Sequence, residues 1–203
     1  MPRPHSRTPR RAAAALRAAG ALLALAGAAC SDPFSVEAQF DTVEQVVTLR
    51  ALTGTPLELP LALLAAPAPQ VVRPSSDFVF DLAFDLDEAG AARLYPVDVV
   101  ARPSVIAGRS VGLLEVTDQS YEQITRAPAG GYVFQEPLSV AVGDVLVLQA
   151  VGHPSCATSF LQPVIYAKLR VEAVDAAART LTLRVLVDPN CGFRGFESGT
   201  PSR

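Results

Sequence analysis

The chain is poor in the side chains that build metal sites and aromatic binding platforms. Its 203 residues include no Trp, four Tyr, two His, three Cys and one Met. So few His and Cys residues leave little material for a zinc site, which takes three or four such ligands. The formal net charge of −3 lacks the basic excess typical of nucleic-acid-binding proteins. No apolar run reaches the roughly 20 residues that a transmembrane helix needs.

The first 29 residues have the layout of a secretory signal peptide. Five of the 17 basic residues lie there and no acidic residue does, so the rest of the chain has 12 basic and 20 acidic residues and a net charge of −8. An apolar segment rich in Ala and Leu, Ala18–Ala29, follows the basic start. Because this segment is too short to span a membrane, we expect residues 1–29 to be a cleaved signal peptide.

Two processing routes fit the end of this segment. The sequence LAGAAC at positions 25–30 resembles the lipobox of bacterial lipoproteins, in which Cys30 would become the lipidated first residue. The alternative is cleavage after Ala28, which would release a free secreted protein. We favour the lipid anchor on Cys30, with residues 30–34 as a tether. Ser31 after Cys30 resembles an outer-membrane address, although the choice between inner and outer membrane stays open.

The two remaining cysteines predict a disulfide. With Cys30 used by the anchor, Cys156 and Cys191 are left, and an even number of cysteines in an oxidising compartment indicates a bridge. The alternative is a pair of buried free thiols. We therefore expect an exported protein, anchored by lipid and facing the periplasm or the cell surface, or else freely secreted.

The mature chain is expected to be all-β, as a mostly antiparallel β-sandwich or β-barrel-like domain. Apolar residues alternate with polar ones in many short runs that are bounded by Gly and Pro, which predicts strands rather than helices. Over residues 77–87 the alternation places Phe and Leu side chains on a face that is expected to be buried. It places the aspartates Asp77, Asp81, Asp85 and Asp87 on a face that is expected to be exposed to solvent. A turn at 88–90 then predicts a return strand over 93–100.

A second hairpin is predicted near the end of the chain, with strands over 168–173 and 181–187. Of two registers that match the apolar faces, we favour the one that places Glu172 and Lys168 opposite Arg184 and Asp188, because the other opposes Arg170 to Arg184. A turn at 143–144 predicts a third hairpin between strands 138–142 and 145–151. Further strands are expected over 36–40, 45–52, 110–116 and 132–135, with one helical turn over 120–125.

The domain limits follow from these elements. The sandwich or barrel domain is expected over 35–196, and the last residues, 197–203, are expected to be a disordered tail. The proline-bearing segment 65–76 is compatible either with a linker or with a long loop across one end of the sandwich.

No catalytic constellation stands out. His153 is the one histidine of the mature chain, and the residues Pro154 and Cys156 beside it favour a loop position over a catalytic one. Asp85 and Asp87 resemble the opening of a calcium loop, but Ala89 stands where a third ligand belongs, so a solvated strand face is the better interpretation. Pairs of acidic residues suited to hydrolysis are numerous, and no pair is singled out. We expect no cofactor, no metal site and no catalytic residue.

The chain resembles a loose group of small exported bacterial lipoproteins with a β-rich body. The similarity lies in the segments 124–128, 131–132, 142–144, 166–171 and 179–181 with the turn at Asp175, about a third of the chain, and these motifs imply hairpins without implying an activity. A more distant similarity is to periplasmic haem-carrier lipoproteins, whose β-rich shell uses a pair of His ligands. The mature chain has one His, so the pair is incomplete.

These observations favour a non-catalytic binding or structural module of the cell envelope. The membrane is expected to be contacted through the N-terminal lipid only, and the partner to be an envelope protein or a small ligand rather than a nucleic acid. One alternative is a carrier of a small apolar ligand or cofactor, held inside a barrel. A second alternative is a hydrolase with an unrecognised acid pair.

Overall fold

The computed structural model describes residues 37–74, 77–101, 108–159 and 163–201. Strands dominate these residues, as the alternation in the sequence predicts. The elements are β1 (Val43–Arg50), β2 (Ala62–Leu64), β3 (Gln70–Val72), β4 (Leu82–Leu86), β5 (Ala92–Pro96), α2 (Val97–Val100), β6 (Ser110–Glu115), β7 (Val133–Phe134), β8 (Leu138–Val140), β9 (Val145–Val151), the 3₁₀ turn η1 (Pro154–Cys156), β10 (Val164–Asp175) and β11 (Thr180–Asp188).

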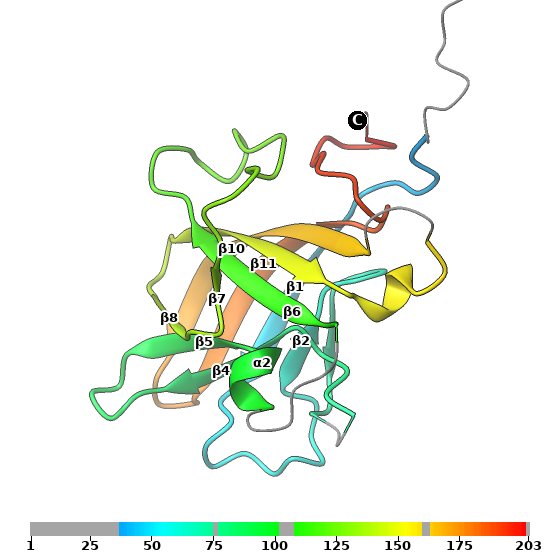
Figure 1. The fold of residues 1–203 in the computed structure, drawn as a ribbon. Helices are drawn as coiled ribbons and strands as arrows, with labels where there is room; N and C mark the ends of the chain where they lie inside the picture. Colours follow the sequence, from blue (N-terminus) through cyan, green and yellow to red (C-terminus); the bar gives the residue numbers. More distant parts are fainter. Residues whose placement is uncertain (1–36, 75–76, 102–107, 160–162, 202–203) are drawn as a thin grey trace, which may run out of the picture. The chain divides into compact units, whose positions relative to one another are not determined.

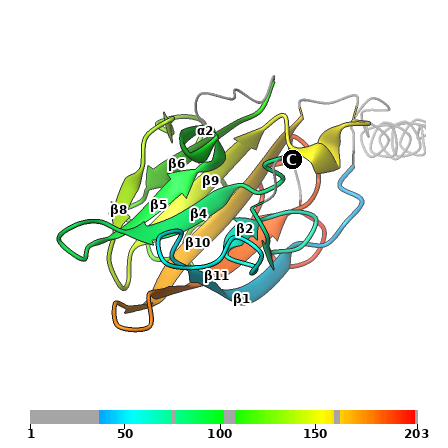
Figure 2. The same ribbon diagram turned by 90° about the horizontal axis from the view of Figure 1, so that it is seen from below.

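The strands form two antiparallel sheets that pack face to face, which confirms the predicted all-β sandwich (Figures 1 and 2). The six-stranded sheet has the order β1-β11-β10-β9-β6-β7, and the five-stranded sheet has the order β3-β2-β4-β5-β8. Among the described residues, no helix is both long enough and apolar enough to pass through a bilayer.

The core lies between the two sheets and is built from alternate residues of their strands. Leu181, Leu183, Val185 and Val187 of β11 are all fully buried, while the residues between them are only partly covered. The large side chains of Phe80, just before β4, of Phe84 in β4 and of Leu94 in β5 belong to the same cluster. Burial of this apolar area, at about 25 cal/mol per Å², is the main stabilising contribution to the fold.

The predicted hairpin β4–β5 is confirmed, but its polar face is not wetted. Asp81 is fully buried and Asp85 is 9% exposed, so the solvated face expected for them is wrong. Each carboxylate is covered because an arginine from a distant element reaches it, Arg109 for Asp81 and Arg179 for Asp85. Sequence alternation locates the strand, but it does not reveal such long-range partners.

The return strand of this hairpin is shorter than predicted. β5 ends at Pro96, and the next four residues form the helical turn α2 instead of continuing the strand to Val100. The side chain of Asp98 in this turn accepts hydrogen bonds from Ser110 Oγ, 2.8 Å, and from the backbone N–H of Val111, 3.1 Å. This contact ties α2 to the start of β6, and so links the two sheets.

The C-terminal hairpin β10–β11 forms in the register that we did not favour. Arg170 stands opposite Arg184, and a β-bulge at Glu172 shifts the pairing between Val171 and Ala173. The bulge brings Glu172 Oε1 within 2.8 Å of Arg184 Nε, and Glu122 Oε1 lies 3.9 Å from Arg170 Nη1. Each arginine therefore has an acidic neighbour, which removes the repulsion that argued against this register.

Three other sequence predictions are wrong for local reasons, and one of two alternatives left open for the segment 65–76 is excluded. The turn at 143–144 does not close a hairpin, because β8 pairs with β5 in one sheet while β9 pairs with β6 and β10 in the other. A hydrogen-bonded turn in which Gln123 N–H donates to Ser120 O replaces the helical turn expected over 120–125. Residues 37–40, where the first strand was expected, form no strand. The segment 65–76 is no linker, since it contains β3, which pairs with β2.

A second, smaller apolar cluster lies on the outer face of the six-stranded sheet. Outward side chains of β9 and β10, among them Val147 and Tyr166, meet Tyr121 and Ile124 of the β6–β7 connection and Phe196 of the C-terminal segment. These two segments together make a loop layer, defined here as residues 116–132 and 192–197. Figure 1 shows them above the six-stranded sheet, on the side away from the five-stranded sheet.

The C-terminal residues continue from this layer. Of the expected tail, residues 197–201 are described, and they contact the chain just before β1. The backbone N–H of Thr42 donates to Gly199 O at 3.3 Å, and Thr200 Oγ1 donates to Asp41 Oδ1 at 3.0 Å.

Candidate functional site

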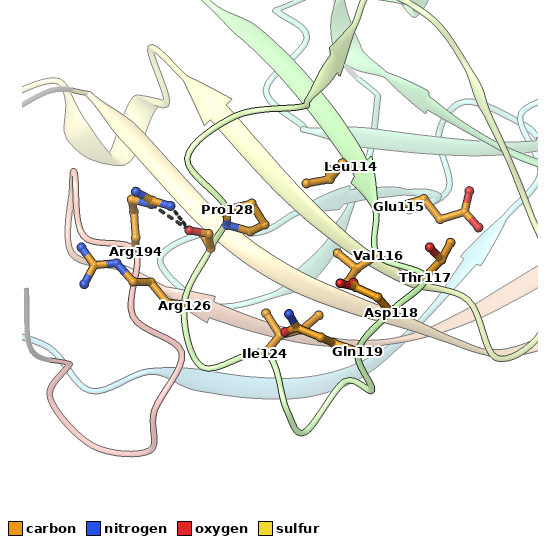
Figure 3. A pocket seen from close by; sticks show the side chains of 11 residues that line it. Leu114, Glu115, Val116, Thr117, Asp118, Gln119, Ile124, Arg126, Pro128 and Arg194 are labelled. Atoms are coloured by element: carbon orange, nitrogen blue, oxygen red, sulfur yellow. Dashed lines mark hydrogen bonds between the residues drawn. The ribbon is translucent and has the colours of Figure 1, made fainter.

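The loop layer and the end of β6 enclose an open groove with a volume of about 490 Å³, called here the front groove (Figure 3). It is lined by residues 114–119, Ile124, residues 126–128 and Arg194. Its residues therefore come from three stretches of chain that the fold brings together. A second hollow of about 440 Å³ lies on the other side of 115–119 and ends at Gly143–Val145 and Arg170.

The front groove has an apolar floor between walls of opposite charge. Leu114, Val116, Ile124 and Pro128 supply the apolar lining. Figure 3 shows Arg126 and Arg194 on one side, with Glu115 and Asp118 on the other. Within the described part of the chain, no salt bridge joins Arg126, Glu115 or Asp118 to another side chain. These charges are therefore available to an external group.

The basic wall is braced by a short ladder between two chain segments. Ala127 N–H donates to Arg194 O at 2.7 Å, Phe196 N–H donates to Thr125 O at 2.7 Å, and Arg126 pairs with Gly195 as an isolated bridge. The Arg194 guanidinium also donates to Ala127 O through Nε, at 2.8 Å, and through Nη2. The wall is thus fixed by backbone pairing before any ligand arrives.

Lys168 holds the loop layer onto the sheet from below. Its side chain is 5% exposed, and Nζ donates to Tyr121 O at 2.8 Å and to Ile124 O at 3.1 Å. The same ammonium lies 4.4 Å from the centre of the Tyr121 ring, within the range of a cation–π contact. Burial lowers the pKa of Lys168, while the nearby carboxylates of Glu44 and Glu122 act in the opposite direction.

Tyr121 anchors the same loop to the edge of the sheet. Its hydroxyl donates to Glu44 Oε2 of β1 at 2.9 Å. Burial, together with this carboxylate, raises the pKa of Tyr121 well above its ordinary value, so the phenol stays protonated as the donor. The loop that forms the floor and one wall of the front groove is therefore fixed at both Lys168 and Glu44.

A buried polar cluster joins the two sheets beside the start of β6, whereas the front groove lies at the end of that strand. Arg109 Nη2 lies 2.9 Å from Asp81 Oδ1 and donates to Phe80 O as well, while Ala65 N–H donates to Asp81 Oδ2. His153 Nε2 lies 3.4 Å from Asp81 Oδ2. Burial opposes the ionisation of Asp81, but His153, Arg109 and Ala65 together outweigh it and lower the pKa of the carboxyl.

The expected loop histidine is therefore a core residue. His153 lies between β9 and η1, as a loop position would, but it is only 1% exposed. Its Nδ1 accepts a hydrogen bond from Ser155 N–H at 3.2 Å, so a ring proton is assigned to Nε2, which faces Asp81. The ring is thus held on both sides by the fold, and it is shielded from solvent.

The acids that resembled a calcium loop have internal partners. Asp85 Oδ2 accepts from Thr53 Oγ1 at 2.6 Å, and Oδ1 accepts from Arg179 Nη2 at 2.9 Å. Asp87 Oδ1 accepts from the backbone N–H groups of Ala89 and Ala91 in the β4–β5 turn. In the ranges that the structure describes, no three His, Cys, Asp or Glu side chains gather as a metal-binding group.

The predicted disulfide Cys156–Cys191 is present. The two Cα atoms are 5.8 Å apart across a sequence separation of 35, and the bridge ties η1 to the chain that follows β11. Phe193 and Arg194 come directly after it, so the bridge also limits where the C-terminal part of the loop layer begins. Cys30, the predicted lipidation site, lies outside the described residues.

Sequence reasoning found none of the groove residues. Glu115, Asp118 and Arg194 belong to no motif, and Arg126 lies in a segment, 124–128, that implied only a hairpin. The fold alone brings these four residues to one place. The nearest signal was the absence of alternation over 117–131, which indicates a long connection of the kind that often carries function. No family model matches the chain, and neither the curated proteins nor the solved structures give a match.

Proposed function

We propose that this protein is a non-catalytic binding module of the cell envelope, anchored by lipid on Cys30, and that it holds its partner in the front groove. The observation that carries the proposal is the pairing of an apolar floor with unpaired charges of both signs. Recognition sites generally combine an apolar contact with a few placed polar groups that fix orientation.

The chemistry of the groove favours an extended polypeptide segment as the ligand. An apolar side chain of such a segment would lie over Leu114 and Ile124. An acidic group on one side of it would face Arg126, and a basic group on the other side would face Glu115 or Asp118. We therefore infer that the partner is an envelope protein with a segment of mixed charge.

Preorganisation supports this function. The ladder at Ala127 and the buried amine of Lys168 fix the walls and the floor of the groove. Binding to a site that is already ordered loses little conformational entropy, which raises affinity for a given contact area.

The filled interior is the reason for preferring a binding module to a carrier. Side chains from both sheets form one continuous apolar cluster, and the two hollows lie outside it. In the described part of the chain, two carboxylates are fully buried, Asp81 and Asp188. Asp81 is engaged by Arg109, and Asp188 Oδ1 accepts two hydrogen bonds from Asn190 while burial raises the pKa of its carboxyl. Neither carboxylate lines one of the two hollows, so the hydrolase alternative is not preferred.

Export is supported by the disulfide, because such bridges persist in oxidising compartments. The anchor itself is tested by palmitate labelling of the wild-type chain and of Cys30→Ala. We expect label on the wild type only, and equal labelling of both chains would refute lipidation at Cys30.

The groove is tested by site-specific photocrosslinking in intact cells that make the full chain. A photoreactive residue is placed at Thr117 in the groove and, as a matched exposed control, at Glu88 in the β4–β5 turn. The proposal predicts a discrete protein adduct from position 117 and none from position 88. An adduct of equal yield from both positions, or no adduct at all from position 117, would count against the groove.

A further inference from the structure

Among the residues that the structure describes, the strand β1 ends the six-stranded sheet, and one of its edges has no partner strand. Its sheet neighbour is β11, with pairs that run from Val43 opposite Val187 to Arg50 opposite Thr180. Figure 2 shows β1 at the outer margin of the sandwich, in blue, beside β11. An open edge presents unpaired backbone groups, which are a template for another strand.

The register identifies the residues whose backbone faces this open edge. Ala51 N–H donates to Arg179 O across the β1–β11 pair. Because the direction of backbone groups alternates along a strand, odd-numbered residues of β1 face β11 and even-numbered residues face outwards. The outward set is Glu44, Val46, Thr48 and Arg50, and all four are exposed.

The open stretch is limited at both ends by other parts of the chain. Thr42 N–H, the next outward group before the strand, donates to Gly199 O at 3.3 Å. Leu52 N–H, the next outward group after it, donates to Phe84 O at 2.8 Å. The two blocked positions lie at equal distances from Val47, so the open stretch has Val47 at its centre.

We propose that this edge binds a second copy of the same chain, with the two β1 strands antiparallel and Val47 on the two-fold axis. In this register the outward residues pair with each other across the axis, Glu44 with the partner's Arg50 and Val46 with the partner's Thr48. Each of the four residues donates one N–H and accepts at one C=O. The blocked Thr42 faces the blocked Leu52 of the other copy, so pairing stops where the open edge stops.

The side chains of the edge are self-complementary in this register alone. The acidic and basic ends of the stretch lie opposite each other twice, once on each side of the axis, and the Glu44 carboxylate would contact the partner's Arg50 while its Oε2 accepts from Tyr121. If one β1 strand slides by two residues along the other, in either direction, Glu44 lies opposite Thr48 or Leu52 of the other copy. Both charge pairs are then lost. Opposite charges across an antiparallel pair stabilise it, and like charges destabilise it.

The exposed side chain of Val46, next to the central Val47, fits the same arrangement. Val46 is 61% exposed, which places it among the most exposed large apolar residues of the described chain. In the dimer it lies on the outer face beside the partner's Thr48, where a β-branched pair packs well. A symmetric contact of this kind closes as a dimer and leaves no further open edge on β1.

Disulfide trapping in cells that make the full chain tests the register. The double variant Val46→Cys/Thr48→Cys places two cysteine pairs opposite each other when Val47 lies on the axis. The matched control Thr48→Cys keeps Glu44 and Arg50 and pairs its cysteine with the partner's copy only in a shifted register, and the wild-type chain reports any bridge from its own cysteines. We expect a covalent dimer on a non-reducing gel from the first variant alone. A monomer from the first variant, or equal dimer from both variants, would overturn the proposal.

Sedimentation of the secreted form with Cys30→Ser, at micromolar concentration, tests the energetics separately. Val46→Pro removes an outward N–H, which an edge strand tolerates, while Val46→Thr keeps it. We expect Val46→Pro and Arg50→Glu to weaken the dimer at least about tenfold, and Val46→Thr to leave it unchanged. Circular dichroism confirms that each variant is folded. A wild-type monomer, or a dimer unaffected by Val46→Pro, would overturn the proposal without affecting the front groove.

Discussion

His153 Nε2 lies 3.4 Å from Asp81 Oδ2, with both side chains buried between the two sheets. His153 follows β9 of the six-stranded sheet and Asp81 precedes β4 of the five-stranded sheet. The separation exceeds that of an ordinary N–H···O hydrogen bond, so the contact is chiefly electrostatic. Together with Arg109, it fastens one sheet to the other far from the groove.

This cluster predicts an acid-sensitive fold. The pKa of Asp81 is lowered in the folded state, so its ionised form contributes stability above the unfolded value of 3.8, and that contribution is lost as pH falls through the lowered pKa. Asp81→Asn should cost about 3–5 kcal/mol at neutral pH, because Arg109 is left buried without its counter-charge. Urea unfolding between neutral and acidic pH measures both effects. The variant should lose less stability on acidification than the exposed control Glu58→Gln, and parallel curves would contradict this account.

Lys168 predicts an alkaline effect on the loop layer. Because burial lowers its pKa from 10.5, Lys168 binds fewer protons in the folded chain than in the unfolded one just below that value, and the contribution of Lys168 to stability rises with pH there, while the raised pKa of Tyr121 acts in the opposite direction. Lys168→Met should abolish this rise and leave the carbonyls of Tyr121 and Ile124 without their donor. Hydrogen exchange should then become faster over residues 120–127 while β9 and β11 stay protected. Unchanged exchange in the loop would show that Lys168 does not hold it.

The disulfide predicts a stability loss on reduction. A bridge across 35 residues contributes roughly 3–4 kcal/mol when its effect is to restrict the unfolded chain. Reductant should lower the urea midpoint of the wild type, while Cys156→Ala/Cys191→Ala should start lower and not respond. An identical midpoint with and without reductant, after thiol titration confirms reduction, would contradict the prediction.

Two glycines with positive φ predict different costs for the same substitution. Gly152 has φ +66°, and a Cβ there would meet Gly108 O at 1.9 Å, whereas Gly143 has φ +98° and open space around it. Gly143→Ala should therefore cost only the backbone strain, about 1–2 kcal/mol. Gly152→Ala should cost clearly more, since the backbone near Arg109 must move. Thermal unfolding of both variants measures the difference, and equal losses would show that the close approach is absent.

Local sequence patterns sufficed for the all-β class, the strands β9, β10 and β11, and the disulfide, because each depends on alternation or on cysteine number. The register of the last hairpin was wrong because one bulge residue, Glu172, shifts the pairing. The third hairpin was wrong because a two-residue turn can also connect different sheets. The buried state of Asp81 and the groove around Arg126 depend on contacts between distant segments, and alternation carries no information about those contacts.

The most direct test of the central claim, that the front groove holds a partner through its charged walls, is the yield of the Thr117 photoadduct in two charge-reversal variants. Arg126→Glu changes the basic wall, and Arg73→Glu makes the same change at an exposed arginine outside the groove. We predict that Arg126→Glu lowers the yield at least about tenfold, in the range typical of residues that dominate an interface, while Arg73→Glu leaves it unchanged. Equal yields from both variants would contradict the claim.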